Sequence, residues 1–331
     1  MKKILSVILL LAVILTVKNN TLDLSEAISA ATEARATVTY LLCGYDDAAE
    51  NTDSIVIATY SFGDNSVSFV QIPRDTYYRD TLYCRINSIY PSARASGETR
   101  AQALATLKGR LSDLLGIRID ASIGYTMDTF VAMINAIGGI DLYMPTPFVI
   151  TGEAGEELLS LSDGYNHLDG EASLAFVRAR GEYRTGDLGR IDAQKLFISA
   201  FVAKLKNDVS AVDIVKACIA TSKGWTIDAK YSDIFQMVAK NHGRMSNVTT
   251  KYASLPGKQV CDKNGVWYYC VAREPAVALF GELGIKVGTF DNGGLMLNSE
   301  NPDFGEVYYS KDIAVKIYDD NTLSQIDVNE R

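Results

Sequence analysis

Several familiar catalytic signatures are missing from this chain of 331 residues. It has no GxxxxGK[ST] phosphate loop, no GxSxG nucleophile turn, no HExxH zinc motif and no SxxK pair. Histidine is scarce, with His167 and His242 as the two imidazoles, and the five cysteines form no CxxC pair. This composition argues against a structural zinc site and gives covalent catalysis little support.

Positive charge is also in short supply. Lys and Arg number 32 against 40 Asp and Glu, which gives a formal net charge of −8. Broad nucleic-acid binding needs a basic surface, so we expect no nucleic-acid partner. The contents of hydrophobic residues, 47%, and of charged residues, 22%, are ordinary for a globular protein. Any site for an anion must therefore be local.

The N-terminus has the charge pattern of a secretory segment. Lys2 and Lys3 precede the apolar run Ile4–Val17, and Lys18 follows it. Basic residues before a short apolar run are typical of a signal peptide or a short signal anchor, and a buried core helix is the alternative. We expect an uncleaved, single-pass anchor in the cell membrane at residues 1–18, with the following domain extracellular. Residues 19–35 then form a juxtamembrane linker.

Helices and strands alternate along the rest of the chain. Apolar, β-branched and aromatic runs predict strands at Thr37–Gly44, Ser54–Ser61, Val67–Pro73, Ile119–Tyr125 and Ile140–Pro145. Helical periodicity predicts helices at Glu98–Leu115, Met127–Ile137, Glu171–Phe176 and Arg190–Asn207, and further helices near 211–220 and 231–240. This alternation predicts an α/β fold over residues 36–285, with a central mixed β-sheet covered by helices. Residues 286–331 are expected to form a peripheral tail.

A hairpin is predicted near residues 259–271. Cys261 and Cys270 flank the turn sequence Asp-Lys-Asn-Gly, so two interpretations remain open. The cysteines form a cross-strand disulfide in an oxidising compartment, or they face each other as reduced thiols.

Charged residues lie at the ends of the first three predicted strands. Asp46 follows the first strand, Asp53 precedes the second, and Arg74 and Asp75 follow the third. If the second and third strands form a hairpin, Asp53 lies at the same end of the sheet as Arg74 and Asp75. The loop after the first strand brings Asp46 to that end as well, unless this loop crosses the whole sheet. The sequence therefore predicts three carboxylates and one arginine at one sheet edge.

A second charged stretch, residues 174–194, contains four arginines in an otherwise acidic chain. Arg178 and Arg180 share a face if this part of the chain is extended. Arg190 and Gln194 lie one turn apart if a helix starts near Leu188. Guanidinium groups bind phosphate oxygens in pairs and keep their charge, so this stretch suits a multiply charged anion. The alternative is a set of exposed arginines paired with surface carboxylates.

Aspartates and arginines together favour phosphoryl or pyrophosphate chemistry. Mg²⁺ binds through one or two carboxylates and completes its shell with phosphate oxygens. Phosphoryl transfer requires mainly positioning and the neutralisation of charge. These residues suit that reaction better than the hydrolysis of peptides or sugars.

Five separated motifs resemble the LytR–CpsA–Psr family in order and approximate spacing. They are NTDSIVIA (51–58), IPRDTY (72–77), RINSIY (85–90), HLDGEASLAFVRAR (167–180) and DLGRIDAQ (187–194). The resemblance implies an α-β-α catalytic domain behind an N-terminal membrane anchor. It also implies an enzyme, a phosphotransferase that moves a glycopolymer, such as teichoic acid or capsule, from a polyprenyl-pyrophosphate lipid to peptidoglycan. Two alternatives stay open, a non-catalytic polyprenyl-phosphate-binding attenuator and a polyprenyl pyrophosphatase.

The resemblance also assigns roles to residues of this sequence. It implies that Asp46 and Asp53 bind Mg²⁺, or Mn²⁺ in its place, with Asp47 as a rival for the first position. It implies that the pyrophosphate is bound by an arginine-rich set, with Asp75 beside it as an orienting partner or base. The members of that set are Arg74, Arg85, Arg178, Arg180, Arg190 and Gln194.

The sequence departs from the family pattern at two positions. Arg85 stands where the family often has Lys, which keeps the charge but changes its geometry. Ala193 replaces a basic residue before the motif's glutamine, so one auxiliary cation is absent. Arg184 matches no motif position and is expected to be a solvated loop charge.

Overall fold

The computed structural model describes residues 37–46, 51–78, 85–152, 154–183, 186–228, 248–262, 264–288, 313–323 and 326. The expected anchor and linker at residues 1–35, the helix near 231–240, and Asp47 and Arg184 lie outside these ranges. None of the described helices combines the length and hydrophobicity that a membrane span requires.

A mixed sheet of seven strands forms the centre of the fold, in the order β13-β10-β3-β2-β1-β4-β9. Strand β2 is antiparallel to both of its neighbours, β1 and β3, as the predicted hairpin requires, whereas β4 is parallel to β1 and β10 is parallel to β3. The prediction of a central mixed sheet is therefore confirmed. The strands span Thr37–Tyr45 (β1), Thr52–Ser61 (β2), Ser66–Gln71 (β3), Ala121–Thr126 (β4), Trp225–Ile227 (β9), Thr249–Ser254 (β10) and Ile317–Tyr318 (β13).

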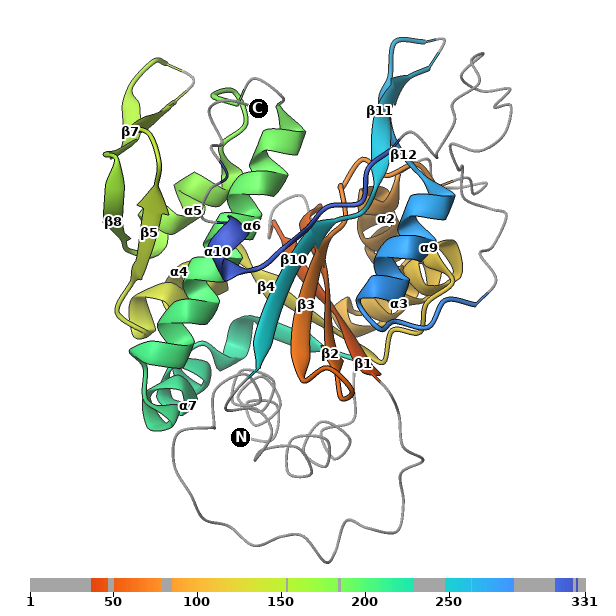
Figure 1. The fold of residues 1–331 in the computed structure, drawn as a ribbon, viewed down its shortest axis with the longest axis horizontal. Helices are drawn as coiled ribbons and strands as arrows, with labels where there is room; N and C mark the ends of the chain where they lie inside the picture. The colour runs from red at the N-terminus through yellow and green to blue at the C-terminus, as the bar shows by residue number, and fades with distance from the viewer. Residues whose placement is uncertain are drawn as a thin grey trace, which may run out of the picture.

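Helices cover both faces of this sheet (Figure 1). On one face lie α2 (Ile89–Ala95), α3 (Arg100–Leu115) and α9 (Arg273–Glu282). On the other lie α4 (Met127–Ala136), α5 (Gly170–Arg178), α6 (Asp187–Asn207) and α7 (Ala211–Ala220). The central strands are buried on both faces, which explains why they read as nearly continuous apolar runs.

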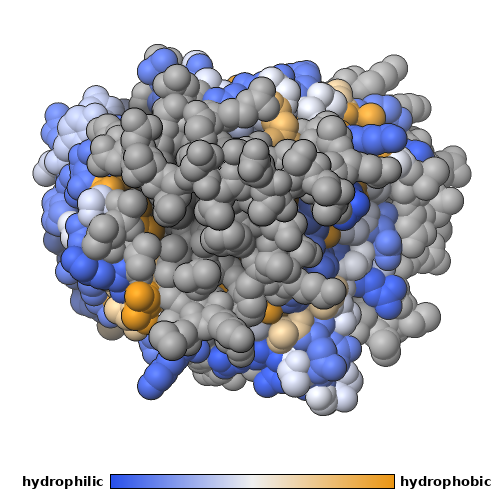
Figure 2. Space-filling model, turned by 90° about the horizontal axis from the view of Figure 1, so that it is seen from below, coloured by the Kyte–Doolittle hydropathy of each residue, from blue (hydrophilic) through white to orange (hydrophobic). Residues whose placement is uncertain are grey.

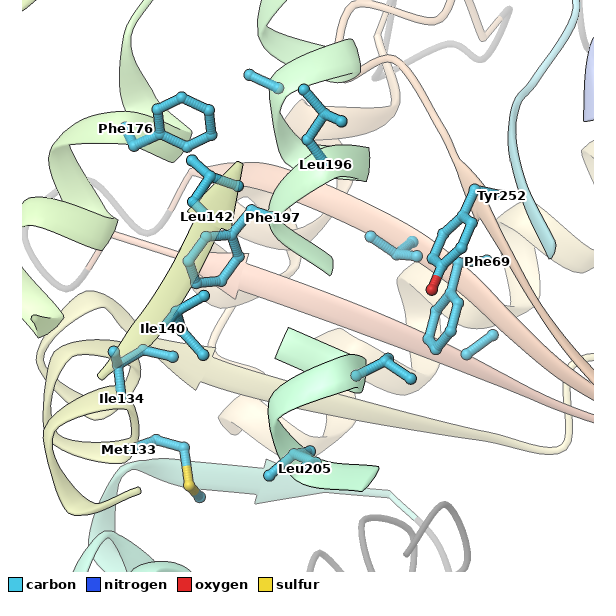
Figure 3. Packing of buried hydrophobic residues seen from close by; sticks show 14 of the residues in the cluster. Phe69, Met133, Ile134, Ile140, Leu142, Phe176, Leu196, Phe197, Leu205 and Tyr252 are labelled. Carbon is cyan, nitrogen blue, oxygen red and sulfur yellow. The ribbon is translucent and has the colours of Figure 1, made fainter. Parts of the chain in front are cut away.

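Alternate side chains of the central strands belong to two separate hydrophobic cores, one on each face of the sheet. Leu41 and Ile57 point into the core under α2, α3 and α9. Val56 and Phe69 point into the core under α4, α5 and α6. In this second core the ring of Phe69 stacks on Tyr252 at 5.7 Å (Figure 3).

The ends of the predicted helices are set by local chemistry. Thr99 and Gln102 form a reciprocal capping box at the start of α3, and Gly116 ends the helix in the left-handed conformation at φ 61°. Thr126 caps α4 by accepting a hydrogen bond from the backbone N–H of Thr129. The helix boundaries predicted for these two segments are confirmed to within two residues.

The predicted strand at Ile140–Pro145 does form, but outside the central sheet. As β5 (Ile140–Met144) it pairs with β8 (Gly164–Leu168), and β6 (Phe148–Thr151) pairs with β7 (Glu157–Leu161). The side chains of β5 alternate between buried and exposed, whereas the central strands are buried on both faces. This alternation is the pattern of a ribbon that packs on one face alone. Figure 3 shows Phe197 of α6 lying between Leu142 and Ile140 of β5.

The described part of the C-terminal segment is not peripheral, contrary to expectation. Strand β13 pairs with β10 in the central sheet, and Leu323 of α10 (Asp320–Leu323) is buried in the core with Ile326. Asp320 accepts hydrogen bonds from three hydroxyl groups, those of Ser199, Thr250 and Tyr252. This segment therefore connects α6 to the edge of the sheet.

The predicted hairpin forms between β11 (Gly257–Cys261) and β12 (Trp267–Val271), but its two cysteines do not face each other. Cys261 is paired with Trp267, and Cys270 is paired with Lys258. Both thiols are free. The expectation of facing cysteines, bridged or reduced, is wrong because the register places them on opposite faces of the hairpin.

The lower side of the molecule, where β1 begins, is shown in Figure 2. The described residues visible on this side are mostly hydrophilic, with scattered hydrophobic patches between them.

Candidate active site

An irregularity in the strand pairing positions the first acidic residue of the site. Gly44 of β1 pairs with Ser54 of β2, but the next residue, Tyr45, pairs with Thr52. Asp53 is thus the extra residue of a β-bulge, a device that redirects a side chain. Asp53 and Ser54 consequently both line the same cavity, although neighbours in a regular strand point to opposite faces.

The turn after β3 brings an arginine to this bulge. Strand β3 ends at Gln71, and in the turn that follows, the backbone N–H of Thr76 donates to the carbonyl of Pro73. Arg74 then reaches back so that its Nη1 lies 2.6 Å from Asp53 Oδ1. The prediction that Asp53 and Arg74 meet at one sheet end is confirmed.

Asp46 lies at the same corner, after the last residue of β1. Its backbone N–H donates to the carbonyl of Asn51 at 3.2 Å, which closes the loop between β1 and β2. The side chain of Asp46 is half-buried. The two predicted metal ligands, Asp46 and Asp53, therefore emerge from adjoining strand ends.

The predicted arginine stretch supplies the other half of the cluster. Gly186, at φ 56°, precedes α6, which starts at Asp187. Arg190 Nη2 lies 2.6 Å from Asp187 Oδ1, and the Nε atoms of Arg74 and Arg180 lie 3.7 Å and 3.6 Å from the same oxygen. Arg180 Nη2 also lies 3.6 Å from Asp53 Oδ1. The two charged stretches, more than a hundred residues apart in sequence, form one cluster.

Arg178 and Arg180 do not share a face of an extended segment, as their spacing suggested. Arg178 is the last residue of α5, whereas Arg180 follows Ala179, whose ψ of 140° turns the chain out of the helix. Arg180 joins the ion-pair cluster. Arg178 is exposed at the rim of the cavity and has no carboxylate partner in the part of the chain that the structure describes.

Gln194 lies one helical turn beyond Arg190, as predicted, and both residues line the cavity. The Nε2 group of Gln194 donates to the carbonyl of Val177 at 3.0 Å, in the last turn of α5. Gln194 therefore fixes α5 against α6 and, with it, the positions of the arginines at the two helix ends.

Asp75 and Arg85 form the outer side of the cluster. Arg85 Nε lies 3.6 Å from Asp75 Oδ1, and Asp75 Oδ2 lies 3.8 Å from Arg74 Nε. The β11–β12 hairpin holds Arg85 from the other side, since Arg85 Nη2 donates to the carbonyl of Trp267 and its guanidinium lies over the ring of Tyr268.

Burial and the repulsion between neighbouring guanidinium groups lower the pKa values of two arginines in the cluster. Burial, and then the charge of Arg74, lower the pKa of Arg180, although Asp187 and Asp53 oppose the shift. Burial lowers the pKa of Arg190 to about 10, again against the attraction of Asp187. Both groups stay charged at neutral pH, in a place that would accept a further anion.

The hydrogen bonding points the same way. The buried Nε–H groups of Arg74, Arg180 and Arg190 have no hydrogen-bond acceptor within the described residues. The carboxylates nearest to Arg74 and Arg180 are 3.6 Å or more from these Nε atoms, beyond hydrogen-bond distance. Buried donors are normally satisfied, so the unsatisfied guanidinium donors of this cluster indicate a site for an anionic ligand.

A cavity of about 230 Å³ opens beside this cluster. Asp53, Arg178, Arg190 and Gln194 line one end. From there the cavity runs between the sheet and the helices α4 and α6 along the whole of β2, and apolar side chains form most of its wall. They include Leu42, Val56, Ala58, Phe69, Phe130, Met133, Phe197, Phe201 and Val202.

Asp46 and Asp53 are the two carboxylates that the family resemblance assigns to a hard divalent cation. Asp46 and Asp53 offer carboxylate oxygens, the ligands that Mg²⁺ prefers, and Mg²⁺ commonly takes only one or two of them with phosphate oxygens and water. Among the described residues, no group of three or more His, Cys, Asp or Glu side chains gathers at one point.

Sequence reasoning gave no role to Asp187, although this residue contacts three of the predicted arginines. The signal was present, because an acidic residue in the first turn of a helix, followed by arginine three positions later, favours an ion pair at the helix N-terminus.

Two neighbours of Gln194 on α6, Ala193 and Lys195, face away from the cluster. Ala193 is buried in the core, and Lys195 pairs with Asp192 at 2.7 Å.

Comparisons with known proteins agree with the fold and the motifs. The model of the LytR_cpsA_psr family matches residues 13–283. The chain is 27% identical over 237 residues to a polyisoprenyl-teichoic acid–peptidoglycan teichoic acid transferase, TagU of Bacillus mycoides, covering 71% of this chain and 73% of the relative.

Solved structures show the same fold. The protein gbs0355 from Streptococcus agalactiae superimposes with a TM-score of 0.65 at 21% identity, over 78% of this chain and 92% of the other. Bacillus subtilis TagV gives a TM-score of 0.56 at 22% identity, over 74% of this chain and 98% of the other.

Proposed function

The chain belongs to the LytR–CpsA–Psr family, and from this premise we propose that it is a phosphotransferase that moves a glycopolymer from a polyprenyl-pyrophosphate lipid to peptidoglycan. The relative TagU bears the name of a teichoic acid transferase of this kind. Teichoic acid, a capsular polymer or a similar glycan is the cargo we propose for this chain.

One observation carries the proposal: an arginine cluster whose buried Nε–H groups are unsatisfied stands beside an apolar cavity. A polyprenyl pyrophosphate has the matching form, a highly charged head on a long hydrocarbon chain. The cluster would bind the pyrophosphate through charge-assisted hydrogen bonds, and the cavity would take up the hydrocarbon chain.

The arrangement can assist phosphoryl transfer by stabilising charge. In such a reaction negative charge spreads over the phosphate oxygens and the leaving group, and fixed guanidinium groups stabilise it without reorganising. Arg74, Arg180 and Arg190 converge within one cluster around Asp53 and Asp187, so their positions are fixed before a substrate arrives. Asp75, at the outer side, is the candidate base for the attacking hydroxyl.

Three further assignments belong to the same proposal. Asp46 and Asp53 would hold Mg²⁺, or Mn²⁺ in its place, which neutralises pyrophosphate charge when bound. Residues 1–18 would anchor the protein in the cell membrane as a single span. The catalytic domain would then lie outside the cell, where peptidoglycan is the acceptor.

The test is a transfer assay with a lipid-pyrophosphate-linked glycan donor and peptidoglycan oligomers. Arg74→Ala and Asp53→Ala should reduce transfer to background while the far-ultraviolet circular dichroism stays unchanged. Arg118→Ala is the matched control, because Arg118 is 69% exposed and pairs with Asp120 away from the cluster. Wild-type transfer rates in both Arg74→Ala and Asp53→Ala would refute the site assignment.

The products of the same assay separate the rival functions. Release of polyprenyl phosphate without glycan on the acceptor would indicate a pyrophosphatase. Tight binding of polyprenyl phosphates without turnover, measured by mass spectrometry of lipid extracted from the purified protein, would indicate an attenuator.

A further inference from the structure

We propose that Trp267, at the tip of the β11–β12 hairpin, is a stacking surface for a sugar ring of the acceptor glycan. This inference rests on the proposed transferase function and adds to it the place where the acceptor binds. Trp267 is 59% exposed, which is unusual for the largest apolar side chain in a protein.

The hairpin is attached directly to the reactive end of the sheet. The backbone N–H of Tyr269 donates to the carbonyl of Asp75, and the N–H of Tyr77 donates to the carbonyl of Tyr269. The ring of Tyr268 also packs edge-on against Tyr77 at 5.2 Å. The strand that carries Trp267 therefore has a fixed position relative to Asp75.

Arg85 links Trp267 to the charged cluster through short contacts. Its Nη2 donates to the Trp267 carbonyl at 2.8 Å, its guanidinium lies 5.0 Å from the centre of the Tyr268 ring, and its Nε lies 3.6 Å from Asp75 Oδ1. Asp75 in turn lies next to Arg74. The main chain at Trp267 is thus one end of a continuous chain of contacts that starts at the proposed pyrophosphate site, and the exposed indole projects from this part of the hairpin.

The chemistry of this surface suits a sugar. A pyranose ring presents C–H groups on its faces and hydroxyl groups around its rim. An exposed indole packs against such an apolar face. Arg85 and Asp75, which contact each other and the main chain of this hairpin, offer a donor and an acceptor for hydroxyl groups of the same glycan.

The position favours the acceptor over the sugar of the donor. The cavity proposed for the lipid lies on the α4–α6 side of the cluster, whereas β11 and β12 rise on the opposite side (Figure 1). In phosphoryl transfer the attacking and leaving oxygens lie roughly in line across the phosphorus atom. With the lipid phosphate leaving toward the cavity, the attacking hydroxyl approaches from the side of Asp75 and Trp267.

Steady-state kinetics of the full-length protein test the proposal, with donor and peptidoglycan fragments varied separately. Trp267→Ala should raise the KM for the acceptor about tenfold, as expected for the loss of one aromatic stack. The donor KM and the slow hydrolysis of donor by water should stay unchanged. Trp267→Phe should recover most of the loss. Tyr165→Ala is the matched control, because Tyr165 is 79% exposed on the separate ribbon β5–β8.

Two kinetic results would overturn the proposal. A rise in the donor KM with an unchanged acceptor KM would assign the indole to a sugar of the donor. Unchanged constants in Trp267→Ala would show that the ring binds neither substrate.

A binding measurement separates this inference from the proposed function. The chain has two tryptophans, so Trp225→Phe leaves Trp267 as the sole indole reporter. A lipid-free peptidoglycan fragment should change its fluorescence in a saturable way, and the absence of any change would overturn the inference. If the wild type transfers no glycan, the proposed function fails, and this titration still decides whether Trp267 binds the sugar.

Discussion

Replacement of Arg190 by methionine should abolish transfer without destabilising the unliganded protein. Arg190 is 3% exposed, and its pKa is lowered to about 10, mainly by burial. A shift of this size means that the charged form costs up to about 3 kcal/mol in the folded state. Methionine has a similar length, carries no charge and leaves no unsatisfied Nε–H donor.

The loss of one ion pair offsets part of this gain. Arg190 Nη2 forms an ion pair with Asp187 Oδ1 at 2.6 Å, and the variant loses this attraction. Asp187 keeps Arg74 and Arg180 within 3.7 Å, so its carboxylate is not left without a cation. We expect Arg190→Met to match the wild type or to exceed its stability by about 1 kcal/mol, which raises Tm by about 2–4 °C.

The assay is thermal unfolding with and without a short-chain polyprenyl pyrophosphate. The ligand should raise the Tm of the wild type and have little effect on Arg190→Met, because the variant lacks a central anion-binding group. Lys195→Met is the matched control on the same helix. Lys195 is also 3% exposed, but its partner Asp192 is 12% exposed and outside the cluster, so this variant should lose stability and keep its response to ligand.

The pH dependence follows from the direction of the Arg190 shift. The folded-state pKa lies below the unfolded value, so the cost of the charged form is fully present below about pH 10 and disappears as the pH rises toward the ordinary pKa of arginine. The Tm difference between variant and wild type should therefore be largest near neutral pH and shrink above about pH 10. A fall in Tm for Arg190→Met as large as that for Lys195→Met would refute the reasoning, because it would make Arg190 a structural partner of Asp187.

Three further predictions concern the cavity, the C-terminal segment and the cysteines. Ala58→Phe places a ring in the cavity, so it should raise the KM for long-chain donors more than for short-chain donors in the transfer assay. Asp320→Ala removes the acceptor of the Tyr252 hydroxyl and of two further hydroxyl groups, so unfolding in urea should show a loss of about 1–3 kcal/mol. Reducing agent should leave Tm unchanged, because Cys261 and Cys270 are unpaired; a drop in Tm would show a bridge.

Local patterns in the sequence were sufficient for much of the fold. The apolar runs of β1, β2 and β3 and the stripe of α3 depend on nearby residues, and the structure confirms them. The meeting of Asp53 with Arg74 was also predictable, since it follows from one hairpin. The five motifs then identified which charged residues share a site.

Other features depend on contacts that no local pattern specifies. The bulge at Asp53 arises from pairing between β1 and β2, and nothing in the segment NTDSIVIA marks it. Asp187 joins the cluster because α6 docks beside the turn at Arg74. The pairing of β13 with β10 joins segments about 65 residues apart, and the polar composition of the C-terminal segment suggested a tail instead. The ribbon β5–β8 is a different case, because its alternation was visible in the sequence and was missed.

The length of β1 sets the height of the reactive centre above the place where the chain enters the sheet. Thr37 pairs with Ser61 at one end and Tyr45 pairs with Thr52 at the other, a span of nine residues or about 30 Å. With residues 1–18 in the membrane as proposed, the entry end faces the bilayer and the arginine cluster faces away from it. The cavity runs along β2 between these two ends. The length of the sheet then sets the lipid length that the protein can use. A lipid tail shorter than the sheet must leave the bilayer to react, whereas a longer tail can reach from the bilayer to the arginine cluster.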